Sequence, residues 1–229
     1  MPTVVAVSVS IISACNIRSH PPLPEQPQQQ LLPLTPLDLA LLSIHYIQYG
    51  LLFHMPHPQD HPIAVFVDRL KHSLSRALAH FFPLAGRLVI QKADDDDASS
   101  SIFINCNGAG AEFIHAAAGY IYVAHLLATS TGVHPIIEAF FPLNQVISHD
   151  GHSLPLLAAQ LTQLGDGFFL ALSFSHVVGA ALLFETSSIH GRRSVEQERA
   201  TSHALRSSNL GFHPIRLPFS NPAEMVEER

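Results

Sequence analysis

The chain of 229 residues has no tryptophan, only two cysteines and few charged side chains. Charged residues make up 13% of the sequence, well below the ~25% that is typical of globular proteins. Because a disordered acidic tail needs high charge and few apolar groups, this composition excludes one. With a net charge of −6 and no basic surface to meet a phosphate backbone, the chain is also predicted not to bind nucleic acid.

The two cysteines, Cys15 and Cys106, exclude the disulfide framework of small secreted domains, and no Cys-x-x-Cys pair exists for a zinc site. No apolar run reaches the ~18 residues that a membrane span needs. The stretch from Val4 to Cys15 raises the alternative of a signal peptide, but its first basic residue, Arg18, follows the stretch. Because serines alternate with valines there, we predict a strand, no membrane association and a cytoplasmic location.

Prolines and the spacing of apolar residues predict the helices. The Pro- and Gln-rich residues 19–36 are expected to form an extended surface connection, because proline is excluded from helix interiors and central strands. A helix is expected to begin at Pro36 and to run to about Tyr49, with Gly50 as its stop. A second, amphipathic helix is predicted over residues 63–81, with apolar side chains at steps of three and four.

Short apolar runs predict strands at residues 88–91, 102–106 and 112–115. The clearest pair is formed by residues 154–164 and 168–175, which Gly-Asp-Gly joins. The second of these runs is apolar on both faces, which is typical of a central strand covered on both sides. Strands and helices together indicate an α/β or α+β layered fold.

Two of the histidine groups among the 16 histidines were considered as metal sites. Zinc could be bound by His54, His57 and His61 with Asp60, but prolines between them favour extended turns and no helical i,i+4 pair aims the rings together. Residues 149–152 are predicted to form a turn, because Asp-Gly supplies a tight bend. We therefore predict no metal site.

Three other motifs also favour structural interpretations. The acidic run of residues 94–97 is expected at a solvated hairpin tip rather than at a cation site. Residues 108–110 form a lone Gly-x-Gly without the third glycine of a phosphate-binding loop. The sequence has no Gly-x-Ser-x-Gly, so an α/β-hydrolase triad has no nucleophile.

His176 is the most informative single residue. It follows the apolar strand expected at residues 168–175 and precedes Val-Val-Gly, so it lies where α/β folds present reactive groups. An imidazole shielded from bulk water there suits a general base. The alternative is a histidine that caps a core strand through hydrogen bonds to its neighbours.

Several segments of the sequence form one pattern, beginning with Leu-Thr-Pro-Leu-Asp at residues 34–38 and Phe-Pro-Leu-Ala-Gly-Arg-Leu at residues 82–88. They are similar to the early L-T-x-x-D block and to the Y/F-P-L-A-G-R-L signature of the plant BAHD acyl-CoA-dependent acyltransferases, which the chain resembles. Residues 175–179, Ser-His-Val-Val-Gly, stand at the place of the family's HxxxDG motif, and residues 144–152 are most similar to the HxxxD-type branch. The resemblance covers nearly the whole chain.

The resemblance implies a chloramphenicol-acetyltransferase-like α/β half-domain, with a mixed sheet and flanking helices. It implies acyl transfer from acyl-CoA, as co-substrate, to a small hydroxyl- or amine-bearing acceptor in plant specialised metabolism, with no bound cofactor. His176 takes the place of the general base of that family. The acceptor would attack the thioester directly, without a covalent acyl-enzyme.

The chain departs from the family pattern in two respects. Ala180 and Ala181 stand where the motif has Asp and Gly, and in relatives the Asp holds the histidine loop through an arginine. Family members are about twice as long, and their second half supplies most contacts to CoA. We therefore expect a truncated first half, with residues 1–190 as the N-terminal acyltransferase domain and residues 191–229 as a polar, proline-containing crossover. Activity is expected to be impaired and the uncovered face to self-associate, with an inactive binding or decoy module as the alternative.

Overall fold

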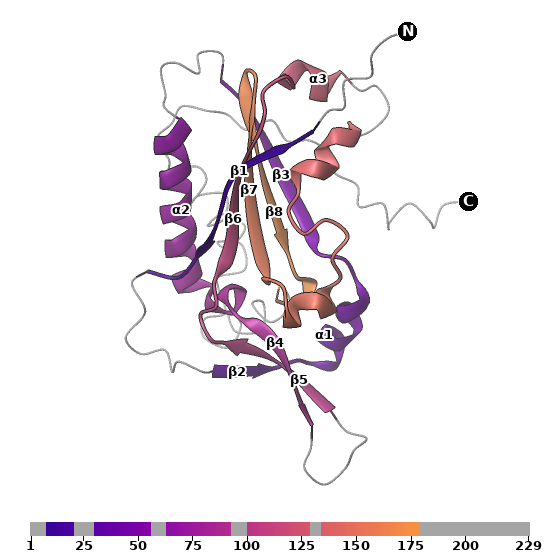
Figure 1. The fold of residues 1–229 in the computed structure, drawn as a ribbon. Helices are drawn as coiled ribbons and strands as arrows, with labels where there is room; N and C mark the ends of the chain where they lie inside the picture. Colours follow the sequence, from indigo (N-terminus) through magenta and orange to yellow (C-terminus); the bar gives the residue numbers. More distant parts are fainter. Residues whose placement is uncertain (1–7, 21–29, 56–62, 93–99, 129–133, 179–229) are drawn as a thin grey trace, which may run out of the picture.

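The computed structural model describes residues 8–20, 30–55, 63–92, 100–128 and 134–178. The larger of its two sheets is a mixed sheet of five strands (Figure 1). Only the β6–β7 pair is parallel among these strands, and the three other pairs are antiparallel. The order across the sheet is β1 (Ser10–Ile17), β6 (Ala111–Ala118), β7 (Leu157–Leu164), β8 (Gly167–Phe174) and β3 (Ile47–His54).

A smaller antiparallel sheet has the order β2 (Gln30–Pro33), β5 (Ser100–Cys106) and β4 (Arg87–Lys92). The strands expected near residues 88–91 and 102–106 are thereby confirmed. The expectation of a surface connection throughout residues 19–36 was wrong in part, because β2 pairs with β5. As an edge strand, β2 accommodates Pro33, whose missing N–H would break the ladder of a central strand.

Helix α2 (Ile63–His80) confirms the amphipathic helix and covers one face of the main sheet (Figure 1). Its buried side chains Phe66 and Val67 pack with Phe168 of β8. The other face is covered by α3 (Val123–Leu127) and the 3₁₀ helix η4 (Pro135–Phe140), which pack against Phe169. Since neighbouring residues of β8 are buried on opposite faces, the prediction of a central, doubly covered strand is confirmed.

The helix expected from Pro36 to Tyr49 was wrong in its second half. Helix α1 covers only Pro36–Ala40, followed by the 3₁₀ turn η1 (Leu41–Ser43). Thr35 begins α1 as an N-cap whose hydroxyl forms a capping box with the buried Asp38. The residues after the turn pair along their whole length with β8, from Ile47 opposite Phe174 to His54 opposite Gly167. This pairing determines the strand, although the apolar spacing also suits a helix.

Two other 3₁₀ turns each precede a strand, η3 (Phe82–Ala85) before β4 of the small sheet and η5 (Ser148–His152) before β7 of the main sheet. Turn η3 follows α2, in agreement with the predicted end of that helix at residue 81. Turn η5 lies where a turn was expected from Asp150-Gly151, and it takes the form of a short 3₁₀ helix. The hairpin tip expected at 94–97 and the crossover expected at 191–229 lie outside the described residues. In the part that is described, no helix is long and apolar enough to cross a membrane.

The central position of Gly50 in β3 predicts a steric effect on stability. An added Cβ would lie 2.3 Å from Cζ of Phe169, so Gly50→Ala overpacks the sheet face. We expect it to lower the free energy of unfolding by about 1–3 kcal/mol, as overpacking typically does. Urea denaturation measures the change. Gly119→Ala is the matched control, because its Cβ would meet no atom within 4 Å, and an equal loss in both variants would contradict the steric explanation.

Candidate functional site

The turn that holds His176 begins where β8 ends. Ser175 donates its backbone N–H to the carbonyl of Leu156 at 3.0 Å, and residues 176–178 are helical. Val177 and Val178 are fully buried among Leu88 and other apolar side chains of the small sheet. The half-buried His176 is therefore held at the junction of the two sheets, at the end of the strand where it was expected.

The imidazole of His176 contacts a backbone carbonyl through one of its two nitrogens. Its Nδ1 lies 2.7 Å from the backbone carbonyl oxygen of His45. Because a carbonyl oxygen only accepts hydrogen bonds, we assign the proton of the neutral ring to Nδ1. Nε2 then carries the free lone pair, and it is the nitrogen that can take a proton from another molecule.

The backbone of His176 has a second anchor. Its N–H donates to the hydroxyl oxygen of Ser148 at 3.2 Å. Ser148 is the first residue of η5 and is fully buried. Sequence reasoning missed both partners: a backbone carbonyl leaves no signature in the sequence, and Ser148 lies 28 residues from His176.

A buried tyrosine and a half-buried arginine lie beside this junction. Tyr46 donates its phenolic O–H to the carbonyl of Pro155 at 3.0 Å. Burial raises the pKa of Tyr46 well above its usual value, partly opposed by the charge of Arg87, so the phenol stays a neutral donor. Burial also lowers the pKa of Arg87, whose Nη1 donates to the carbonyls of Gly86 and Gly110 at 2.7 and 2.9 Å. Both side chains thus act here as structural ties between loops.

A second imidazole, that of the buried His115 in β6, lies apart from this junction. Burial lowers the pKa of its imidazole, and the neighbouring charge of Lys71 lowers it further. Its Nε2 is buried without a hydrogen-bond partner among the described residues. His115 is therefore neutral and belongs to the sheet face under α2 rather than to the His176 site.

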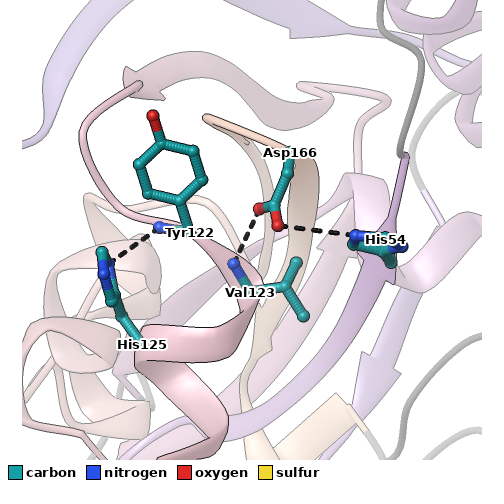
Figure 2. Close-up of polar contacts among 5 residues, drawn as sticks. All are labelled: His54, Tyr122, Val123, His125 and Asp166. Carbon is teal, nitrogen blue, oxygen red and sulfur yellow. Dashed lines mark hydrogen bonds and ion pairs between the residues drawn. The ribbon is translucent and has the colours of Figure 1, made fainter.

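His54, the first residue of the histidine-rich loop considered for zinc, pairs with a carboxylate instead (Figure 2). Its Nε2 lies 3.5 Å from Oδ2 of Asp166 in the β7–β8 turn, and the other carboxylate oxygen accepts the N–H of Val123 at 2.7 Å. This network is at the opposite end of β8 from His176, because His54 pairs with Gly167 and Ile47 with Phe174.

His57, Asp60 and His61 lie outside the described residues. Within the part that is described, no three His, Cys, Asp or Glu side chains are grouped so as to hold a metal ion. The lone Gly-x-Gly of residues 108–110 connects β5 to β6, with positive φ at Gly108 and Gly110. At Gly110 an added Cβ would lie 2.6 Å from Oδ1 of Asn16, so close packing accounts for this glycine.

Known proteins resemble this chain in both sequence and structure. A sequence profile described as the transferase family matches residues 8–185. An uncharacterized acetyltransferase of Arabidopsis thaliana is 39% identical over 221 residues, which cover 93% of this chain and 48% of the relative. The BAHD acyltransferase DCR of the same plant is 30% identical over 179 residues, covering 75% and 35% of the two chains.

Among solved structures, vinorine synthase superposes with a TM-score of 0.55 at 23% identity, over 74% of this chain and 38% of its own. The TRI101 protein of F. sporotrichioides, solved with coenzyme A and T-2, superposes with a TM-score of 0.50 at 17% identity, over 65% and 34%. These matches confirm the expected α/β half-domain with a mixed sheet and flanking helices. The chain spans about half, or less, of the length of these proteins.

The Asp166 network predicts unequal effects for its two side chains. Asp166→Ala removes the acceptor for the Val123 N–H at the start of α3, so we expect a loss of about 1–2 kcal/mol in the free energy of unfolding, as for a helix cap. His54→Ala removes only a partly exposed ion pair and should cost less than about 1 kcal/mol. Urea denaturation distinguishes the two, and a larger loss for His54→Ala would contradict this ranking.

Proposed function

The chain belongs to the BAHD acyltransferase family, and from that premise we propose that it transfers an acyl group from acyl-CoA to a small hydroxyl- or amine-bearing acceptor, with His176 as general base. The observation that carries the role of His176 is the bond from its Nδ1 to the His45 carbonyl. That bond leaves the basic Nε2 unoccupied by any described residue of the chain. A coenzyme A complex of one structural neighbour is consistent with the acyl donor.

In the proposed reaction, Nε2 of His176 accepts the proton of the acceptor hydroxyl or amine as its oxygen or nitrogen attacks the thioester carbonyl carbon. The new C–O or C–N bond forms a tetrahedral oxyanion. Collapse of this oxyanion breaks the C–S bond, and the leaving thiolate of CoA takes the proton back from the imidazolium. The products are an ester or amide and free CoA, and His176 returns to its neutral form.

We further propose that the chain by itself is a slow enzyme. Ala180 stands where the family motif has Asp, and the chain spans only about half of its relatives. Without the Asp, the histidine loop loses the group that fixes it in relatives, and displacements near 1 Å reduce rates by about 10²-fold. The same two observations favour the second candidate, an inactive homologue that acts as a binding or decoy module.

Exposed apolar side chains on the edge strand β1 support the proposal that this surface binds a partner. Ile11 and Ile12 of β1 are 67% and 55% exposed at the edge of the main sheet. Exposed apolar groups of this kind favour association, so self-association through the face that a second half would cover stays a prediction.

The cytoplasmic location and the domain boundary at residue 190 are likewise proposals.

The role of His176 is tested by His176→Ala in the purified chain. If the side chain is the general base, kcat/KM for acyl transfer should fall by about 10²–10⁴-fold. The assay follows free CoA released from acetyl-CoA or a related donor in the presence of alcohol and amine acceptors. His72→Ala, which removes an exposed imidazole from α2, is the control. Equal turnover in the wild type and His176→Ala would remove His176 from the mechanism.

The missing motif carboxylate is tested by Ala180→Asp. If loss of the carboxylate limits the rate by letting the histidine loop move, its return should raise kcat by up to about 10²-fold. Ala180→Asn introduces a side chain of nearly the same size as aspartate but without its charge, so it should raise kcat less than Ala180→Asp does. An unchanged kcat in Ala180→Asp would show that the missing carboxylate does not limit the rate, and no turnover in any variant would favour the binding module.

A further inference from the structure

We propose that Ser148 is a positioning residue for His176, and that it acts together with the His45 carbonyl to fix the Nδ1–H tautomer and the direction of Nε2. The catalytic meaning of this inference rests on the proposed function. The two anchors contact different parts of the histidine. Ser148 Oγ accepts the backbone N–H at 3.2 Å, whereas the His45 carbonyl accepts the ring Nδ1–H at 2.7 Å.

Both anchors belong to one short bridge between distant segments. His45 and Ile147 form an isolated antiparallel β-bridge. On its two sides, Tyr46 donates its N–H to the Val146 carbonyl at 2.9 Å, and Ser148 donates its N–H to the Ile44 carbonyl at 2.8 Å. The segments that carry the His45 carbonyl and the Ser148 hydroxyl are thus fixed relative to each other by backbone bonds that do not involve His176.

The backbone ahead of this bridge is strained. Leu143 and Gln145 have φ values of 53° and 62°, a region that residues other than glycine rarely occupy. Gln48 of β3 holds the same turn through a 3.0 Å bond from its Nε2 to Oδ1 of Asn144. Such strain persists where surrounding contacts require it, and it concentrates at functional sites. Here the strained turn places residues 146–148 beside residues 44–46, with which they form the bridge.

Burial alone does not explain the contact of Ser148. Ser173 and Ser175 are also fully buried at this end of β8, yet their hydroxyls have no hydrogen-bond partner among the described residues. Ser148 differs because its hydroxyl reaches the His176 backbone. Ser173 therefore supplies a matched control: the same residue type and the same burial, two positions before the turn.

The tautomer is measured first, in the wild-type chain labelled with ¹⁵N. Long-range ¹H–¹⁵N correlation spectra of the neutral imidazole distinguish a protonated Nδ1 from a protonated Nε2, and His176→Ala assigns the signals. We expect His176 as the Nδ1–H form and a slowly exchanging backbone amide. A neutral ring protonated on Nε2, or an amide that exchanges as fast as an unbonded one, overturns the proposal without any variant.

The contribution of Ser148 is measured next with Ser148→Ala, Ser148→Thr and Ser173→Ala. We expect Ser148→Ala to mix the two tautomers and to lower kcat by about 10- to 10²-fold, the effect of a small misplacement, while the KM for acyl-CoA is unchanged. Ser148→Thr keeps the hydroxyl and should keep the Nδ1–H form, and Ser173→Ala should match the wild type. If Ser148→Ala does not fold, the wild-type amide exchange and tautomer decide.

The outcomes separate this inference from the proposed function. If the tautomer depends on Ser148 but the wild type transfers no acyl group, the positioning role stands and the enzymatic function fails. If turnover depends on His176 while Ser148→Ala retains both the Nδ1–H form and the wild-type kcat, Ser148 has no positioning role. A loss of kcat with unchanged tautomer and equal loss in Ser173→Ala would also overturn it, because both variants would then act through general destabilisation.

Discussion

The antiparallel pairing of β8 with its two neighbours is the constraint on which the rest of the structure depends. Phe168 and Phe169 of this strand pack in opposite directions and are fully buried, so each face of the sheet needs its own cover. Helix α2 covers one face, and α3 with η4 covers the other. The same register places Asp166 at one end of the strand and His176 just beyond the other. The position of the proposed base is therefore a consequence of core packing.

The sequence pattern correctly predicted the elements that depend on their own residues and not on a distant partner. The stripe of apolar side chains in α2 and the continuous apolar run of β8 depend on burial, which the sequence displays directly. The prediction of a helix as far as Tyr49 was wrong in its second half, because pairing with β8 determines that those residues form the strand β3. Gly50, interpreted as a helix stop, is instead required by the ring of Phe169, which lies more than 100 residues away in sequence.

The candidate site divides in the same way. His176 could be located from its place after an apolar strand and from a family resemblance. Its partners could not, because one is a backbone carbonyl and the other is brought near by a strained turn at Leu143 and Gln145. The prolines around His54 argued against a zinc site, and in the structure this side chain pairs with Asp166 from the β7–β8 turn. Spacing along the chain contains no information about such pairings.

The hydrogen bond from His176 to the His45 carbonyl joins residues 131 positions apart. A contact of this sequence separation closes a long loop, and the chain loses more entropy in closing it than a local contact requires. Before β3 and β8 have paired and the Val146–Ser148 segment has docked, His176 is an ordinary flexible side chain. The orientation of its ring thus depends on contacts that only the folded chain supplies. A partly folded chain would contain every residue of the proposed site and still lack a directed base, so damage anywhere along these strands would be expressed first as a loss of chemistry.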